Sequence, residues 1–215
     1  MITIPTKEEW IAALIERHGE ERQRAFLSAT VAVCGLGGLG SNISICLARA
    51  GIGKLIIIDF DKVDITNLHR QQYNADQIGK YKTDALEENL RKINPFIEIV
   101  KHRVKLDEEN LMNILKDTDI VCEAFDKAES KAMLVNAVLS DMPDKYIISG
   151  SGMAGFADAN LIKTKRITER FYLAGDLQSD VNDGIGLVSS RVMVCAAHEA
   201  HIVLRLLAGE QELQK

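Results

Sequence analysis

One stretch of the sequence, VAVCGLGGLGS at residues 31–41, joins a short β-branched apolar run to a cluster of glycines. A helix-favouring segment, ISICLARA at residues 43–50, follows it. This order predicts a strand, a tight glycine turn and a helix. Such a turn presents free backbone N–H groups and the positive end of a helix dipole, which together attract a phosphate.

The turn contains four glycines that we predict to contact a nucleotide: Gly35, Gly37, Gly38 and Gly40. Glycine is needed where a Cβ would forbid the turn or hold the phosphates away. Asp59 ends the next apolar run, where a carboxylate can bind ribose hydroxyls. The glycine spacing also fits GxGxxG, so a NAD-dependent dehydrogenase remains an alternative. A second alternative is that the glycines serve only the turn and the close packing of the helix, without binding a nucleotide.

Composition narrows the class of protein. The chain has 215 residues, enough for one well-buried α/β domain, with 47% hydrophobic and 27% charged residues. The net charge of −5 argues against a nucleic-acid partner. The sequence has neither an apolar run long enough for a membrane helix nor an apolar signal segment at its start. We therefore expect a cytoplasmic protein without a membrane partner.

Apolar runs alternate with helical patterns through most of the chain. The predicted strands lie at residues 31–34, 55–58, 96–100, 120–125 and 146–149. Strands alternating with helices predict an α/β, Rossmann-like fold with a mainly parallel sheet and helices on both faces.

Two regions flank this pattern. Before it, a capping box at residues 6–9 begins the first of two helical pieces, so we divide the chain into an N-terminal helical segment, 1–29, and a single nucleotide-binding domain, 30–215. After it, residues 159–162 and 171–173 predict short strands that add antiparallel to the sheet. A polar loop at 175–186 and a long apolar helix at 187–207 complete the domain.

The segment DFDKVDITNLHRQ at residues 59–71 carries most of the predicted chemistry. Strand ends in such sheets point to the ligand crevice, so an acid cluster, an amide and an arginine are delivered to the nucleotide. The candidate ligands of the ribose and phosphates are Asp59, Asp61, Asn67, Arg70 and Gln71. Arg70 can bind phosphate oxygens in a bidentate way, or it can pair with Asp61 or Asp64 at the surface.

Two further residues stand at predicted element ends. Lys82 lies in the first turn of a helix, where its charge opposes the dipole unless it faces an anion. An ordinary surface lysine is the alternative. Asp126 follows the strand at 120–125, where it could bind Mg²⁺ on the phosphates or cap the helix at 128–139.

The chain resembles the ThiF/MoeB/HesA family. The resemblance rests on four features in order: GLGGLGS at 35–41, the segment 59–71, Lys82 behind Gly79, and Asp126. The family resembles the adenylation domain of ubiquitin-activating enzymes, and the likeness extends from about residue 20 to 209. It marks 30–215 as a ThiF-type adenylation domain. Within the family, the chain is most similar to short ThiF-type members that adenylate the sulfur carrier ThiS in thiamine biosynthesis.

The resemblance implies an adenylyltransferase that uses ATP and Mg²⁺. The C-terminal Gly-Gly carboxylate of a ubiquitin-like sulfur carrier protein would attack the α-phosphate, giving an acyl-adenylate and pyrophosphate. Arg70, Lys82 and Asp126 would be the catalytic residues, with Asp126 on the metal. The family also implies a homodimer and a separate sulfur donor.

The chain departs from the family in three ways. It has four single cysteines, at 34, 46, 122 and 195, and no CxxC pair, so we expect no structural zinc. Residues 163–194 contain no cysteine for a thioester or acyl-disulfide step. The N-terminal arginine that crosses the family's dimer has only a distant counterpart, Arg17. A MoaD-like carrier in molybdopterin synthesis, a tRNA-modifying dehydratase and a non-catalytic scaffold remain alternatives.

Overall fold

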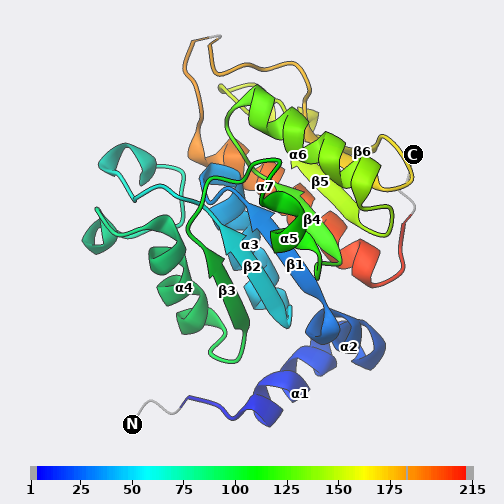
Figure 1. Ribbon diagram of the computed structural model, residues 1–215. Helices are drawn as coiled ribbons and strands as arrows, with labels where there is room; N and C mark the ends of the chain where they lie inside the picture. Colours follow the sequence, from blue (N-terminus) through cyan, green and yellow to red (C-terminus); the bar gives the residue numbers. More distant parts are fainter. Residues whose placement is uncertain (1–3, 183, 212–215) are drawn as a thin grey trace.

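The computed structural model describes residues 4–182 and 184–211, so the outer ends of both predicted segments, 1–3 and 212–215, lie outside the described residues. Within the described part, a seven-stranded sheet has the order β3-β2-β1-β4-β5-β7-β6 (Figure 1). The strands are β1 Thr30–Cys34, β2 Lys54–Ile58, β3 Glu98–His102, β4 Ile120–Glu123, β5 Tyr146–Gly150, β6 Lys163–Arg166 and β7 Phe171–Gly175. All neighbouring strands run parallel except β6, which runs antiparallel to β7. The predicted Rossmann-like fold is therefore confirmed.

Helices cover both faces of the sheet. They are α1 Lys7–His18, α2 Glu20–Ser28, α3 Gly38–Ala50, α4 Lys82–Ile93, α5 Leu111–Leu115, α6 Ala128–Asp141 and α7 Ser189–Leu207, with short 3₁₀ turns η1 Ile65–Asn67, η2 Ala75–Gln77 and η3 Ala159–Leu161. Alternate β1 side chains divide between two cores: Val31 and Val33 pack with α3, α4 and α7, while Ala32 and Cys34 pack with α5 and α6. Burial on both faces explains why the strands read as continuous apolar runs.

Two strand predictions were displaced by local side-chain bonds. The strand expected at 96–100 begins at Glu98, because Asn94 Oδ1 accepts the Phe96 N–H and turns the chain first. The strand expected at 159–162 is η3 instead, because the Asp158 side chain accepts the Asn160 N–H. The strand predicted at 171–173 is present as β7, but it is antiparallel only to β6 and runs parallel to β5.

The strand order places a switch point between β1 and β4. From β1 the chain continues through β2 to β3 on one side, whereas β4 and β5 lie on the other. The loops that follow β1 and β4 therefore leave in opposite directions at the carboxyl end of the sheet, where ligands bind in open α/β sheets. The glycine turn and Asp126 follow these two strands.

The N-terminal helices lie at one end of the sheet (Figure 1). The predicted capping box begins α1: Thr6 Oγ1 accepts the Glu9 N–H and Glu9 accepts the Thr6 N–H. No residue of α1 is buried, whereas Phe26 of α2 belongs to the core. Among the described helices, none has the length and apolar character needed to cross a membrane.

One acid lies deep between α7 and the sheet. Glu199 is fully buried, and its Oε1 is 3.9 Å from Cys195 Sγ, while its Oε2 has no hydrogen-bond partner among the described residues. Burial raises the pKa of Glu199 well above its usual range, and nearby Glu123 adds to this while Lys131 opposes it. The folded state therefore favours a protonated Glu199.

We predict that Glu199→Gln becomes progressively more stabilising, relative to the wild type, as the pH rises from 5 to 8. The folded protein holds this proton more tightly than the unfolded chain, so wild-type stability falls with increasing pH by at most about 1.4 kcal/mol per pH unit from this group. Glutamine does not titrate and keeps the neutral form. Urea unfolding of both proteins at the two pH values measures the difference, and a difference that does not grow with pH would contradict the assignment.

Candidate nucleotide-binding site

The glycine turn is closed by contacts that leave no room for side chains. Gly35 has φ +92°, and a Cβ there would lie 2.8 Å from the Ala124 carbonyl oxygen. A Cβ on Gly40 would lie 1.8 Å from the Gly35 oxygen. No side chain caps α3 at Gly37, so the first N–H groups of the helix remain available to an anion.

Asp59 ties the tip of β2 to this turn. Its Oδ2 accepts the Leu36 N–H at 2.7 Å, and its Oδ1 accepts the Asp61 N–H at 2.7 Å. The residue is buried. Asp59 thus shapes the turn through the backbone, a role that the sequence reasoning did not anticipate; its contact with a ribose stays a prediction.

Lys82 faces the two acids at the end of β2. Its Nζ is 3.0 Å from Asp61 Oδ2 and 3.8 Å from Asp59 Oδ2, and its side chain is 8% exposed. The lysine in the first turn of α4 therefore meets anions, but those anions belong to the protein. Beside them Tyr73, missed in the sequence, donates its hydroxyl to the Leu36 carbonyl at 2.8 Å. Burial, helped by Asp59 and Asp61, raises the pKa of Tyr73 well above its usual range.

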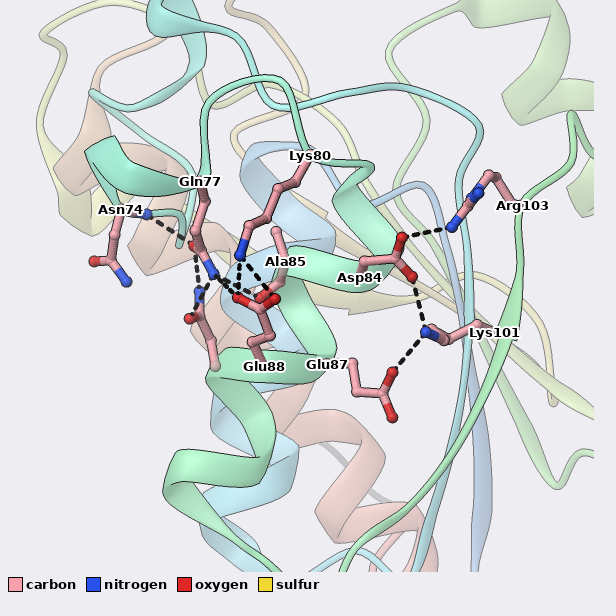
Figure 2. Close-up of polar contacts among 10 residues, drawn as sticks. Asn74, Gln77, Lys80, Asp84, Ala85, Glu87, Glu88, Lys101 and Arg103 are labelled. Atoms are coloured by element: carbon pink, nitrogen blue, oxygen red, sulfur yellow. Dashed lines mark hydrogen bonds and ion pairs between the residues drawn. The ribbon is translucent and has the colours of Figure 1, made fainter.

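A network of charges fastens α4 and so fixes Lys82. Figure 2 shows Asp84 between Lys101 and Arg103, with Lys101 also bound to Glu87. The Lys101 ammonium group lowers the pKa of Asp84, mainly through its hydrogen bond. The other half of the network joins Lys80 to Glu88 and Gln77 to Asn89. The cleft of about 580 Å³ next to this network is lined largely by charged side chains that pair with one another, and no residue of the glycine turn is among those that line it.

A second set of bonds holds Arg70 and Gln71 against the glycine turn. Asn42 Nδ2 donates to the carbonyls of Gly38, at 2.7 Å, and Arg70, at 3.1 Å. A Cβ on Gly38 would lie 3.5 Å from Arg70 Cγ, and one on Gly37 would lie 3.9 Å from Gln71 Nε2. Asn42 is therefore a site residue that the sequence did not reveal, although its place in the second turn of the glycine-led helix was a usable signal.

Two polar atoms next to the turn lack partners. Within the described residues, Arg70 Nε and Gln71 Oε1 are buried without a hydrogen bond. Burial lowers the pKa of Arg70, and Asp126 partly offsets this, so these two charges are electrostatically coupled. Because buried unpaired polar groups are unfavourable, the arrangement is suited to a polar ligand.

The surface pairing considered for Arg70 is wrong. Arg70 Nη1 donates to the Thr66 carbonyl, Asp61 pairs with Lys82, and Asp64 accepts the Thr66 N–H at the start of η1. Asn67 is the last residue of η1, and its side-chain oxygen accepts the Asp64 N–H at 3.3 Å and so closes this turn.

Asp126 stands exposed beyond β4. The helix that follows begins after Lys127 without a side-chain cap, so the alternative reading of Asp126 as an N-cap is wrong. No set of three or more His, Cys, Asp or Glu side chains in the described residues is placed to hold a metal. A single carboxylate fits only a cation such as Mg²⁺ that takes its other ligands from phosphates and water.

The three buried cysteines are poor candidates for a nucleophile. Cys34, Cys122 and Cys195 are buried, and all four cysteines are free thiols. Burial raises the pKa of each of the three buried thiols. Since the thiolate is the reactive form, these cysteines act as core residues.

The glycine contacts give a matched pair of variants. We predict that Gly40→Ala loses at least about 1–3 kcal/mol of folding free energy, because its Cβ collides with the Gly35 carbonyl and the backbone must move. Gly37→Ala meets only ordinary contacts and changes stability by about 1 kcal/mol or less. Chemical denaturation of both variants checks this, and equal stabilities would show that the turn is not closed as described.

The sequence of the chain is similar to those of known proteins. Residues 11–215 match the model of the ThiF family. The chain is 35% identical over 142 residues to the adenylyltransferase and sulfurtransferase MOCS3 of Caenorhabditis briggsae, in an alignment that covers 65% of this chain and 35% of that protein. It is 31% identical over 127 residues to the sulfur carrier protein adenylyltransferase of Thermus thermophilus, covering 59% and 47%. The chain thus spans about a third to a half of the length of these relatives.

The fold is shared with solved structures over nearly the whole chain. The E. coli tRNA N6-threonylcarbamoyladenosine dehydratase TcdA, in complex with ATP, has a TM-score of 0.85 and 20% identity, covering 97% of this chain and 98% of that one. With 20% sequence identity, this similarity shows that the two proteins share a fold. Because the family model covers all but the first ten residues, this chain belongs to the ThiF family.

Proposed function

We propose that this protein uses ATP to adenylate the C-terminal glycine carboxylate of a ubiquitin-like sulfur carrier protein. The observation that carries the proposal is that Arg70 Nε and Gln71 Oε1, beside the uncapped start of α3, are buried and have no hydrogen-bond partner within the described part of the chain. The names of the Caenorhabditis and Thermus relatives, both adenylyltransferases, support it, as does ATP in the complex of TcdA. The family membership also leaves the dehydrogenase alternative without support.

The site acts by positioning and charge neutralisation. The glycine turn and the N-terminus of α3 receive the phosphates, and Arg70 beside Gly38 binds their oxygens. Asp61 is 52% exposed, so it can turn toward solvent when a phosphate takes its place at Lys82. The carrier carboxylate then attacks the α-phosphorus, the bond to the β-phosphate oxygen breaks, and pyrophosphate leaves. Such a displacement requires aligned reactants and stabilised charge rather than a protein nucleophile.

Mg²⁺ fits this proposal through Asp126, whose exposed carboxylate lies within electrostatic reach of Arg70. The cation would neutralise charge on the phosphates when bound. Asp59 and Asp61 at the β2 tip are the candidate ribose ligands.

The identity of the carrier protein is a further part of the proposal. We propose a ThiS-like carrier ending in Gly-Gly, a homodimeric enzyme and a separate sulfur donor. A MoaD-like carrier is the second candidate, since the MOCS3 relative is also an adenylyltransferase and sulfurtransferase by name. The full-length fold match to TcdA favours a tRNA-modifying dehydratase as a further one, although the net charge of −5 opposes binding to tRNA.

Pyrophosphate exchange into ATP tests the reaction. We expect exchange with a ThiS-type carrier and little with a MoaD-type carrier or with a ThiS-type carrier that lacks its last glycine. Exchange only with the MoaD-type carrier would move the assignment to that pathway. A protein that binds ATP but exchanges with neither carrier would be a scaffold or act on another carboxylate.

We predict that Asp126→Asn lowers carrier-dependent exchange by about 100-fold or more, because it removes the charge that faces Arg70 and the metal. The side chain is exposed, so the variant should unfold at the wild-type temperature. Asp141→Asn, an equally exposed acid at the other end of α6, is the matched control and should keep full activity. Full activity in Asp126→Asn would remove this residue from the catalytic set.

A further inference from the structure

A second buried acid lies directly behind Asp126. Glu123 is the last residue of β4 and is fully buried. Its Oε1 accepts the Phe125 N–H at 2.7 Å, and its Oε2 accepts hydrogen bonds from Lys131 Nζ, at 2.8 Å, and from Ser149 Oγ. One carboxylate therefore joins the tip of β4, helix α6 and strand β5.

The sheet does not need an acid at this position. In the register, Glu123 lies beside Cys34 of β1, which in turn lies beside Ile58 of β2. These two neighbours carry no charge, Ser149 of β5 on the other side is also uncharged, and the backbone of β4 is already paired on both sides. A buried carboxylate is unfavourable unless it is fully partnered, so its three bonds indicate a specific task.

The task concerns the short link between β4 and α6. Between Glu123 and Ala128 the chain has no helix or strand. The Ala124 N–H bonds to the Cys34 carbonyl, and the Phe125 N–H bonds to Glu123, so Asp126 emerges from a turn that the Glu123 side chain closes. The same turn brings the Ala124 carbonyl and the Phe125 ring against Gly35.

We propose that Glu123 is a positioning residue for Asp126: through the Phe125 N–H, it holds the strand-tip carboxylate beside Arg70 and the nucleotide. Lys131 and Ser149 keep the Glu123 carboxylate in place and satisfy its charge. This inference rests on the proposed function, because it concerns how Asp126 reaches a metal on bound ATP.

The test is equilibrium binding of ATP by titration calorimetry, with and without Mg²⁺. In the wild type, we expect Mg²⁺ to raise the affinity for ATP. In Glu123→Gln, we expect this increase to be smaller by about tenfold or more, as for other residues that orient a metal ligand. ATP affinity without Mg²⁺ should stay unchanged. In an Asp126→Asn background, Glu123→Gln should have no further effect, because both act through the same carboxylate.

Glu199→Gln is the matched control, since Glu199 is also buried beside this cluster but, among the described residues, makes no hydrogen bond to the β4 tip. It should leave the Mg²⁺ effect intact. If Glu123→Gln does not fold, as thermal unfolding will show, Ser149→Ala removes one bond to the same carboxylate and should give a smaller loss of the same kind.

Equal weakening of ATP binding with and without Mg²⁺ would overturn the inference, and so would an undiminished effect in the Asp126→Asn background. Failure of the proposed function looks different, because the wild type would then show no carrier-dependent pyrophosphate exchange. A wild type that exchanges normally, together with an unaltered Glu123→Gln, would reject the role of Glu123 alone.

Discussion

The site depends on the close approach of two backbone segments at the carboxyl end of the sheet. The loop after β1 meets the tip of β4 at Gly35, where the Ala124 carbonyl occupies the space of a side chain. Gly40 brings the first turn of α3 equally close to the Gly35 carbonyl. Because only glycine allows both contacts, the uncapped helix start, the β2 tip and the β4 tip converge on one small volume. Asp59, bonded to the Leu36 N–H of this turn, and Lys82 beside Asp59 are held relative to that junction.

At this junction, Lys82 is paired with the acids of the β2 tip before any ligand binds. Lys82 lies between Asp59 and Asp61, and Arg70 keeps one guanidinium nitrogen unpaired. When a phosphate replaces Asp61 as the partner of Lys82, the number of ion pairs of Lys82 stays the same. Phosphate binding therefore does not leave the buried Lys82 ammonium group unpaired. This preorganisation agrees with a reaction in which the protein aligns two substrates and spreads charge.

Much of this could be read from the sequence because the signals were local. A β-branched run followed by glycines, with an acid after the next strand, predicted the fold. The segment at 59–71 and the helix start at Lys82 predicted that Asp59, Asp61 and Lys82 lie at one end of the sheet, where the structure pairs them. What could not be read depended on contacts between distant segments. Asn42 bonds to the Arg70 carbonyl, and Glu123 accepts a hydrogen bond from Ser149. In the sequence of a single helix or strand, neither residue differs from an ordinary polar residue. The shifted start of β3 followed from one asparagine side chain, whose competing bond outweighed the apolar pattern.

The proposed function requires the triphosphate of ATP to lie over the glycine turn. A crystal structure of the protein with ATP and Mg²⁺ would locate the phosphates. We expect phosphate density at the start of α3 within hydrogen-bonding distance of Arg70 and Lys82, with the cation beside Asp126. Phosphates bound instead in the surface cleft near Lys80 and Lys101, or anywhere else away from Gly38, would contradict it.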